Sequence, residues 1–318
     1  MVTIKNDHDV TDENYYSKEM GLKYLSVHAL MTYMKDPSLF WLKAHGYLIN
    51  TSSDSANAGR LFHAFMNDEK DYKQEVMALG KTPFNVGRKK VDEDEIIATV
   101  LTDPYVMKPK APYEAVWSFI TENWEKRHAI WNDDEYIKEL ILVGEIGGAP
   151  FKGRLDKLKV VGNKAYIYDY KTIALKEHYG FWYQEDIDGN VKRYDKSFIH
   201  DYNYDLQMTA YAELVKQNFP DVKDVYITFG MLIKKGKHEF TEYPTSFVET
   251  ETVNVRDLST KRFDGETPLS VLMNQSKYAY DLLQMNQQDM LDTYGSSLMT
   301  EMVTNSGQKL KFEDFKLN

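Results

Sequence analysis

The most regular alternation of apolar and polar residues lies near the middle of the chain. Three runs of strand character follow one another at residues 139–146, Phe151–Val161 and Ala165–Lys171. Glycine-containing turns separate them at Gly147–Pro150 and Gly162–Asn163. Short glycine turns between such runs are typical of β-hairpins. The pattern therefore predicts a three-stranded antiparallel meander.

Apolar residues at helical spacing predict helices on both sides of this meander. The expected helices run from Ser26 to about Leu48 with a break at Pro37, over Ala56–Met66 after the N-capping run Ser52–Ser55, and over 204–218 and 267–292. Asp224–Ile233 predicts a further strand, whereas residues 94–101 and 111–124 fit either type of element. Ile173 to Tyr202 forms a connection of about thirty residues with little periodicity, and connections of that length tend to be functional or mobile.

This order of elements predicts an α/β (α+β) fold. The length of 318 residues suits about two domains, or one large domain with helical additions. The expected division is a helical N-terminal region over 1–50, a core over 51–262 and a helical C-terminal extension over 263–318.

Composition narrows the class of protein. The chain has no cysteine, which excludes disulfides, thiolate zinc sites, cysteine nucleophiles and iron–sulfur clusters. No apolar run is long enough for a membrane span, and the N-terminus lacks the apolar core of a secretion signal. The net charge of −10 argues against a protein that coats nucleic acid, but not against an enzyme with a local DNA groove. We expect a cytosolic protein without a membrane partner.

The predicted hairpin brings two carboxylates together. Asp169 and Lys171 share one face of the third strand, and Asp156 on the second strand lies about as far from the Gly162–Asn163 turn as Asp169 does. Two carboxylates beside a lysine can hold a divalent cation, and oxygen ligands favour Mg²⁺ or Mn²⁺ over zinc. Two simpler interpretations stay open: the charges lie at an exposed strand end, or Asp156 pairs with a neighbouring basic side chain.

Four short motifs carry a resemblance to a known family. They are Gly59-Arg-Leu-Phe-His63, Gly153-Arg-Leu-Asp156, Asp169-Tyr-Lys171 and Gln207-Met-Thr-Ala-Tyr211. In this order, on a predicted helix, two strands and a helix, they resemble the PD-(D/E)xK nuclease superfamily. The flanking helical motifs resemble its RecB-like and phage-exonuclease branch, which includes the nuclease domain of bacterial exonuclease VIII. The resemblance implies a restriction-endonuclease-like core with a mixed central sheet flanked by helices.

The resemblance also implies roles for individual residues. Asp156, Asp169, His63 and the backbone carbonyl of Tyr170 would hold Mg²⁺, and Lys171 would act on the attacking water or on the phosphate. Gly59 would let the face of the helix that carries His63 approach the sheet closely. Glu145 matches a glutamate of the exonuclease VIII relatives, although a solvent-facing strand residue is an equal interpretation. Gln207 and Tyr211 would lie near DNA and the lysine.

Further DNA contacts are expected from basic and aromatic residues. Arg154 and Lys152 lie near the motif, and two basic runs occur at Arg88–Lys90 and Lys234–Lys235, although such runs are more often solvated surface. Aromatic residues of the long connection could stack on bases; they are Tyr179, Phe181, Trp182 and Tyr183.

The expected function is hydrolysis of linear double-stranded DNA by a 5′→3′ exonuclease of phage-type recombination. The family's proline before the motif aspartate is absent, since Leu155 and Tyr168 stand there, and the missing cysteines exclude the iron–sulfur clasp of some RecB-like relatives. The resemblance further implies a ring-shaped homo-oligomer and a single-strand annealing protein as partner. The alternatives are a structure-specific endonuclease or single-strand nuclease on the same core, and a catalytically silent DNA-binding or assembly module.

Overall fold

The computed structural model describes most of the chain. The described residues are 8–48, 53–86, 92–174, 184–185, 191–192, 198–234, 236–238, 241–243, 246–258 and 265–304. No helix among them combines the length and the apolar character that a membrane crossing requires.

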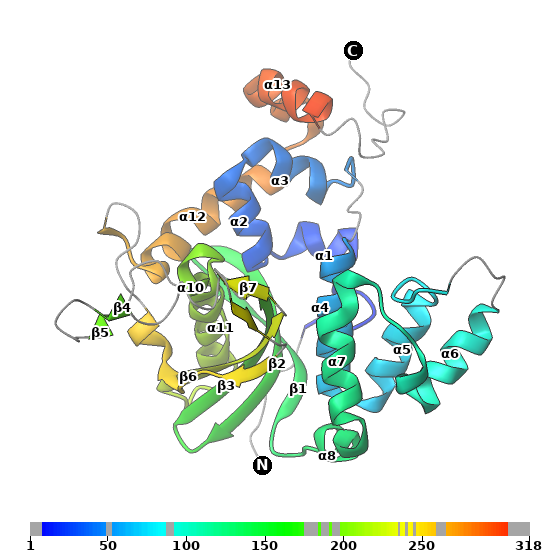
Figure 1. The fold of residues 1–318 in the computed structure, drawn as a ribbon. Helices are drawn as coiled ribbons and strands as arrows, with labels where there is room; N and C mark the ends of the chain where they lie inside the picture. Colours follow the sequence, from blue (N-terminus) through cyan, green and yellow to red (C-terminus); the bar gives the residue numbers. More distant parts are fainter. Residues whose placement is uncertain are drawn as a thin grey trace.

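A mixed sheet forms the centre of the protein (Figure 1). Its strands are β1 (Ile137–Ile146), β2 (Ala149–Val161), β3 (Lys164–Ala174), β6 (Asp224–Lys234) and β10 (Val253–Asn254), in that order, with β9 (Ser246–Glu249) also paired to β6. The first three are antiparallel neighbours, whereas β3 and β6 are parallel. Two small pairs complete the strands: β4 (Gln184–Glu185) with β5 (Val191–Lys192), and β7 (Gly236–His238) with β8 (Thr241–Tyr243).

Glycine turns fix the register of the meander. Gly147 and Gly148 have φ values of +59° and +77°, and Gly162 has +59°. Residues with positive φ match the twist of a two-residue hairpin turn. The predicted meander is confirmed, with strands longer than expected: β2 begins at Ala149, so Ala149 and Pro150 belong to the strand rather than to the turn.

One face of the sheet packs against helices from both ends of the chain (Figure 1). The residues of α11 (Tyr204–Asn218) and α12 (Pro268–Leu283) share one large hydrophobic cluster with β1, β2, β3 and β6. The N-terminal helices α2 (Val27–Lys35) and α3 (Pro37–Ala44) join the same cluster, and Trp41 donates its indole N–H to the carbonyl of Met285 at 3.1 Å. The remaining elements in this part are α1 (Lys18–Lys23), α10 (Phe198–Asp201), α13 (Gln287–Thr304) and the 3₁₀ turn η4 (Val255–Leu258).

The opposite face of the sheet packs against an aromatic-rich cluster. Its helices are α4 (Asp54–Asn67), α5 (Glu69–Leu79), α6 (Glu93–Thr102), α7 (Glu114–Asn123) and α8 (Arg127–Trp131), with the 3₁₀ turns η1 (Pro104–Val106), η2 (Ala111–Tyr113) and η3 (Trp124–Lys126). Helices on both faces of a mixed sheet confirm the predicted α+β architecture.

Most predicted helices are present at nearly the expected bounds. Pro37 separates α2 from α3, the Ser53 side chain caps α4 by accepting the N–H of Ala56, and α11 covers 204–218 as predicted. The helix expected over 267–292 is interrupted after Leu283 and continues from Gln287. The ambiguous segments at 94–101 and 111–124 are mainly helical, in α6 and α7.

The strands β2 and β3 separate at one end of the meander. Their paired residues run from Val161 and Lys164 to Lys157 and Tyr168. Beyond that point the edge of β2 bonds instead to the N-terminal segment: Leu25 donates its N–H to Pro150 and accepts the N–H of Lys152, at 2.9 and 2.8 Å. A sheet that opens in this way exposes side chains from both of its faces to one space.

Candidate active site

Asp156 and Asp169 lie across from each other where β2 and β3 separate. The last paired residues are Lys157 and Tyr168, so the two aspartates occupy the next register position. Instead of a backbone carbonyl, Asp156 Oδ2 accepts the backbone N–H of Tyr170 at 2.7 Å. The side chain of Asp156 therefore replaces a sheet hydrogen bond and is fixed by the backbone that carries the second aspartate.

His63 approaches the Asp156 carboxylate from the helices that pack on the other face of the sheet from α11 and α12. It lies on α4, and its Nδ1 is 3.3 Å from Asp156 Oδ2. Gly59, one turn earlier, faces β3: a Cβ at this position would lie 3.5 Å from Thr172 Oγ1. That distance is an ordinary contact, so α4 does pack closely on the sheet, but an alanine would fit there as well.

Lys171 is held between Asp169 and α11. Its Nζ lies 2.5 Å from Asp169 Oδ2 and 4.6 Å from the ring centroid of Tyr204, and it donates to Gln207 Oε1 at 3.4 Å. Gln207 in turn donates from Nε2 to the hydroxyl of Tyr211 at 2.9 Å. The two residues of the Gln-x-x-x-Tyr motif thus form a chain of hydrogen bonds that ends on the lysine.

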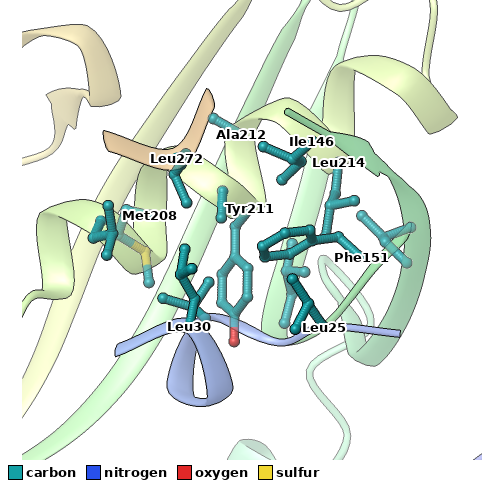
Figure 2. Packing of buried hydrophobic residues seen from close by; sticks show 14 of the residues in the cluster. Leu25, Leu30, Ile146, Phe151, Met208, Tyr211, Ala212, Leu214 and Leu272 are labelled. Carbon is teal, nitrogen blue, oxygen red and sulfur yellow. The ribbon is translucent and has the colours of Figure 1, made fainter. Parts of the chain in front are cut away.

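Tyr211 is a buried support of the site. Figure 2 shows its ring among Leu30, Phe151 and Leu214, with its hydroxyl pointing toward the N-terminal segment. A Cβ on Gly153 would lie 2.9 Å from Tyr211 Cε1 and 3.0 Å from Leu214 Cδ1. The glycine of the Gly-Arg-Leu-Asp motif therefore leaves the space that the tyrosine ring occupies.

The charges of the site act on one another. Burial raises the pKa of Asp169 to about 6, with Asp156 adding to the shift and Lys171 opposing it. Burial also acts to raise the pKa of Asp156, but His63, Lys171 and the N–H of Tyr170 outweigh it and lower that pKa. For Lys171 the effect of burial is outweighed by Asp169, and for His63 by Asp156, so both pKa values are raised. Each carboxylate thus has its own basic neighbour, His63 for Asp156 and Lys171 for Asp169.

Glu139 is a site residue that the sequence analysis missed. It occupies the β1 position across from Asp156, between the paired residues Lys138–Lys157 and Leu140–Leu155. Its φ of +48° is one of two positive values among the described non-glycine residues. Burial and then the charge of Asp156 raise the pKa of Glu139 to about 7. Counting residues from the Gly147–Gly148 turn places position 139 opposite 156. The hairpin register is therefore the sequence signal from which Glu139 could have been predicted.

Glu145, the predicted acidic residue of β1, lies elsewhere. It pairs with Pro150 beside the hairpin turn, and its side chain is exposed. Its backbone is held by Gln217 of α11, whose amide accepts the N–H of Glu145 at 2.9 Å and donates to its carbonyl at 2.8 Å. The structure therefore places Glu145 away from Asp156 and Asp169 and favours the solvent-facing alternative.

The four residues expected to contact DNA beside the site all have partners within the protein. Lys152 is buried, and its ammonium donates to the carbonyl of Tyr15 at 2.5 Å. Arg154 is bound by Glu139, with 2.9 Å between Nε and Oε2, and donates to the hydroxyl of Tyr16 at 3.0 Å. Gln207 and Tyr211 are only 7% and 8% exposed. These contacts indicate that all four side chains support other protein groups, and their contact with DNA stays a prediction.

Several other predicted contacts lie outside the described residues. These are the basic run Arg88–Lys90, Lys235, and the aromatic residues Tyr179, Phe181, Trp182 and Tyr183.

His63, Asp156, Asp169 and the carbonyl of Tyr170 are the groups available for a cation. In the described part of the chain no three carboxylates or imidazoles already surround a single point. However, Asp169 Oδ2 is buried and accepts no hydrogen bond of regular geometry from the described residues, although the ammonium of Lys171 lies 2.5 Å from it. A buried carboxylate oxygen in that state, beside a second carboxylate, fits Mg²⁺ or Mn²⁺ by the chemistry of its donors.

The mixed sheet, with Asp156 on one strand and Asp169 and Lys171 on the next, defines a restriction-endonuclease-like protein of the PD-(D/E)xK type. The family described as "PDDEXK-like domain of unknown function (DUF3799)" matches residues 39–257, a range that contains all four motifs. The chain belongs to this family, and the predicted membership of the PD-(D/E)xK superfamily is confirmed. These findings support a nuclease.

A solved structure has the same fold. The "Putative exonuclease" from Eubacterium rectale aligns with a TM-score of 0.52 at 17% identity, covering 91% of this chain and 88% of its own. At that identity the likeness shows the fold alone. A second solved structure, at 12% identity over 84% of this chain and 86% of its own, has a TM-score of 0.26, which is too low to indicate a shared fold. None of the curated proteins matches the chain.

Proposed function

We propose that the protein is a metal-dependent deoxyribonuclease that hydrolyses linear double-stranded DNA from its ends in the 5′→3′ direction. The observation that carries this proposal is the convergence of His63, Asp156, Asp169 and Lys171 where β2 and β3 separate. The name of the Eubacterium rectale structure supports exonuclease rather than endonuclease action. The duplex substrate, the polarity and a role in phage-type recombination rest on the resemblance of the motifs.

A divalent cation is part of the proposal, Mg²⁺ with Mn²⁺ as a substitute. Asp156 and Asp169 would hold it, with His63 and the carbonyl of Tyr170 as further ligands. When bound, such an ion polarises the scissile phosphate and makes the attacking water more acidic. An iron–sulfur cluster has no place here because the chain contains no cysteine.

The chain's own residues supply orientation and charge. Hydrolysis forms a bond from a water oxygen to phosphorus and breaks the bond from phosphorus to the leaving oxygen, with negative charge building on the phosphate. Lys171 presents a fixed positive charge beside the carboxylates, held by Asp169 and Gln207. A preorganised charge aimed at developing charge is a large source of catalysis. His63 and the N–H of Tyr170 hold Asp156 in a single orientation.

The decisive test is a timed digest of end-labelled linear duplex with Mg²⁺. Lys171→Ala should reduce the initial rate by at least about 100-fold, because the fixed charge is lost. Lys159→Ala is the matched control: Lys159 is also a strand lysine, paired with Glu135 at 2.9 Å outside the site. Near-normal cleavage by the Lys171 variant, with both variants folded by circular dichroism, would remove the core of the proposal.

The same digest separates the proposal from a structure-specific endonuclease or single-strand nuclease. An exonuclease releases label from one end of linear duplex and leaves a covalently closed circle intact. Comparing 5′ and 3′ labels reports the polarity. Cutting of the circle, or activity on single strands alone, would overturn the exonuclease assignment while leaving a nuclease.

A catalytically silent DNA-binding or assembly module is the alternative of another class. The presence of Asp156, Asp169 and Lys171 in one site argues against it. Calorimetric titration with Mn²⁺ decides the matter together with the digest: neither binding nor cleavage is the result that a silent module predicts.

From the same resemblance we propose that the protein forms a ring-shaped homo-oligomer around DNA and that its partner is a single-strand annealing protein. Analytical ultracentrifugation of the full chain tests the first, since a monomer at micromolar concentration contradicts a stable ring.

A further inference from the structure

Tyr16 is an exposed aromatic side chain held in a fixed position. At 77% it is the most exposed large hydrophobic side chain in the described part of the chain. Its ring meets that of Tyr15 edge to face, with 4.9 Å between centroids and 82° between planes, and its hydroxyl accepts a hydrogen bond from Arg154 at 3.0 Å. Because these two contacts already hold the exposed ring in place, a ligand that binds to it loses little affinity to ordering of the side chain.

The segment that carries Tyr16 is attached to the sheet. Tyr15 is buried with Val10, Met20 and Ile141 of β1. Its carbonyl accepts the ammonium of Lys152, which also lies 4.7 Å from the Tyr15 ring centroid. These contacts fix the position of the neighbouring Tyr16 relative to β2.

Tyr16 lies beside the candidate active site. The guanidinium carbon of Arg154 is 5.2 Å from the ring centroid of Tyr16. Arg154 and Asp156 are alternate residues of β2, so they point to the same side of the strand about 7 Å apart. That spacing is about the rise of two stacked bases at ~3.4 Å each.

The charges around Tyr16 favour a base over a phosphate. Arg154, the nearest cation, already forms an ion pair with Glu139 at 2.9 Å. Lys152 is buried against Tyr15. The surface therefore offers an aromatic face whose neighbouring positive charge is balanced, and such a face stacks on nucleobases irrespective of their identity.

We propose that Tyr16 is a stacking platform for a nucleobase of the strand that enters the active site. The inference rests on the proposed function and specifies it further. A base inside a duplex has both faces covered by its neighbours, so the base on Tyr16 must be unstacked on one side. The expected substrate is therefore a strand end whose last bases have left the duplex.

Abasic substrates test this subsite directly. Wild-type protein should bind and cut linear duplex with intact terminal nucleotides about tenfold better than duplex with abasic nucleotides there, the size of one base–aromatic contact. Tyr16→Ala should raise KM for the intact substrate to that of the abasic one and leave the abasic substrate unaffected. Tyr16→Phe should keep the preference, because the ring remains although the bond to Arg154 is lost.

A control and a second readout keep the test decisive. Tyr278→Ala removes another exposed tyrosine, 66% exposed on α12, and should behave as wild type. If Tyr16→Ala weakens binding of both substrates equally, or Tyr16→Phe behaves like Tyr16→Ala, the side chain acts by holding Arg154 and the platform is refuted.

Fluorescence anisotropy with the Lys171→Ala variant measures the same preference without cleavage. Absence of cleavage with the preference intact overturns only the proposed function; cleavage without the preference overturns only this inference.

Discussion

The two ends of the β1–β2 hairpin differ although they belong to the same pair of strands. At the turn end the pairing is unbroken, Glu145 lies opposite Pro150, and Gln217 satisfies both backbone groups of Glu145. At the other end the pairing skips the position of Glu139 and Asp156, and Glu139 has a φ of +48°. At the regular end the contacts hold backbone, whereas the irregular end carries the charged groups of the candidate site.

The difference has a physical reason. Regular pairing engages the backbone groups of both strands and keeps side chains of opposite faces apart. The position that the β1–β2 pairing skips is also the point where β2 and β3 separate. There Asp156 can accept the N–H of Tyr170 on β3 and still meet His63, which comes from the other helix layer. Backbone in a sparsely populated conformation persists only where its surroundings hold it, and such positions cluster at functional sites. Loss of regular pairing is thus what lets both layers contribute to one site.

The largest expected effect on the cleavage rate comes from removing one carboxylate charge at the site end of the hairpin, compared with removing one at the turn end. Asp156→Asn keeps an oxygen that can accept the N–H of Tyr170 but removes the carboxylate, so the cleavage rate should fall about 1000-fold. Glu145→Gln removes the same charge from the turn end and should leave the rate within about twofold, as surface substitutions do. Initial rates on linear duplex measure both variants. Equal loss in the two would mean that net charge, and not position, controls the reaction.

The second prediction concerns two glutamines of α11. Gln207 holds Lys171 at the site end, and Gln217 holds the backbone of Glu145 at the turn end. Gln207→Ala removes one of the two groups that hold Lys171, leaving Asp169, and should slow cleavage about tenfold, as loss of a ligand's supporting group does. Gln217→Ala leaves two backbone groups of Glu145 without partners and should lower the free energy of unfolding by about 1 kcal/mol with the rate unchanged.

Urea unfolding and cleavage rates on both glutamine variants give the four values needed. The comparison fails if Gln217→Ala slows cleavage as much as Gln207→Ala does, because the helix would then couple both ends to the site.

Much of this arrangement follows from local sequence signals. The glycine turns at 147–148 and 162–163 fix the hairpin register, which places Asp156 beside Asp169 and Glu139 beside Asp156. Contacts between distant segments carry no such signal. Leu25 bonds to the edge of β2 beyond the point where β2 and β3 separate, and no spacing in the sequence predicts this contact.

Burial of a charged residue is the other feature that the sequence does not predict. Lys152 reads as a DNA contact because lysines are rarely buried without a partner. Its partner is a backbone carbonyl of the N-terminal segment, so the side-chain pattern of β2 gives no indication of it.

The smallest effect concerns the backbone at the two glutamates of β1. Glu139→Gly and Glu139→Ala both remove the ion pair with Arg154, so the difference between them reports the backbone alone. At φ +48° an alanine should be less stable than a glycine by about 1 kcal/mol, because its Cβ approaches the following carbonyl.

At Glu145 the sign should reverse. In a regularly paired strand a glycine is less stable than an alanine by about 0.5–1 kcal/mol, since it loses more conformational freedom on folding. Urea unfolding of the four variants at equal m-values measures both differences. The same sign at both positions would show that the backbone at Glu139 is not strained. Opposite signs would mean that, of these two positions of β1, backbone strain is stored at Glu139, next to Asp156.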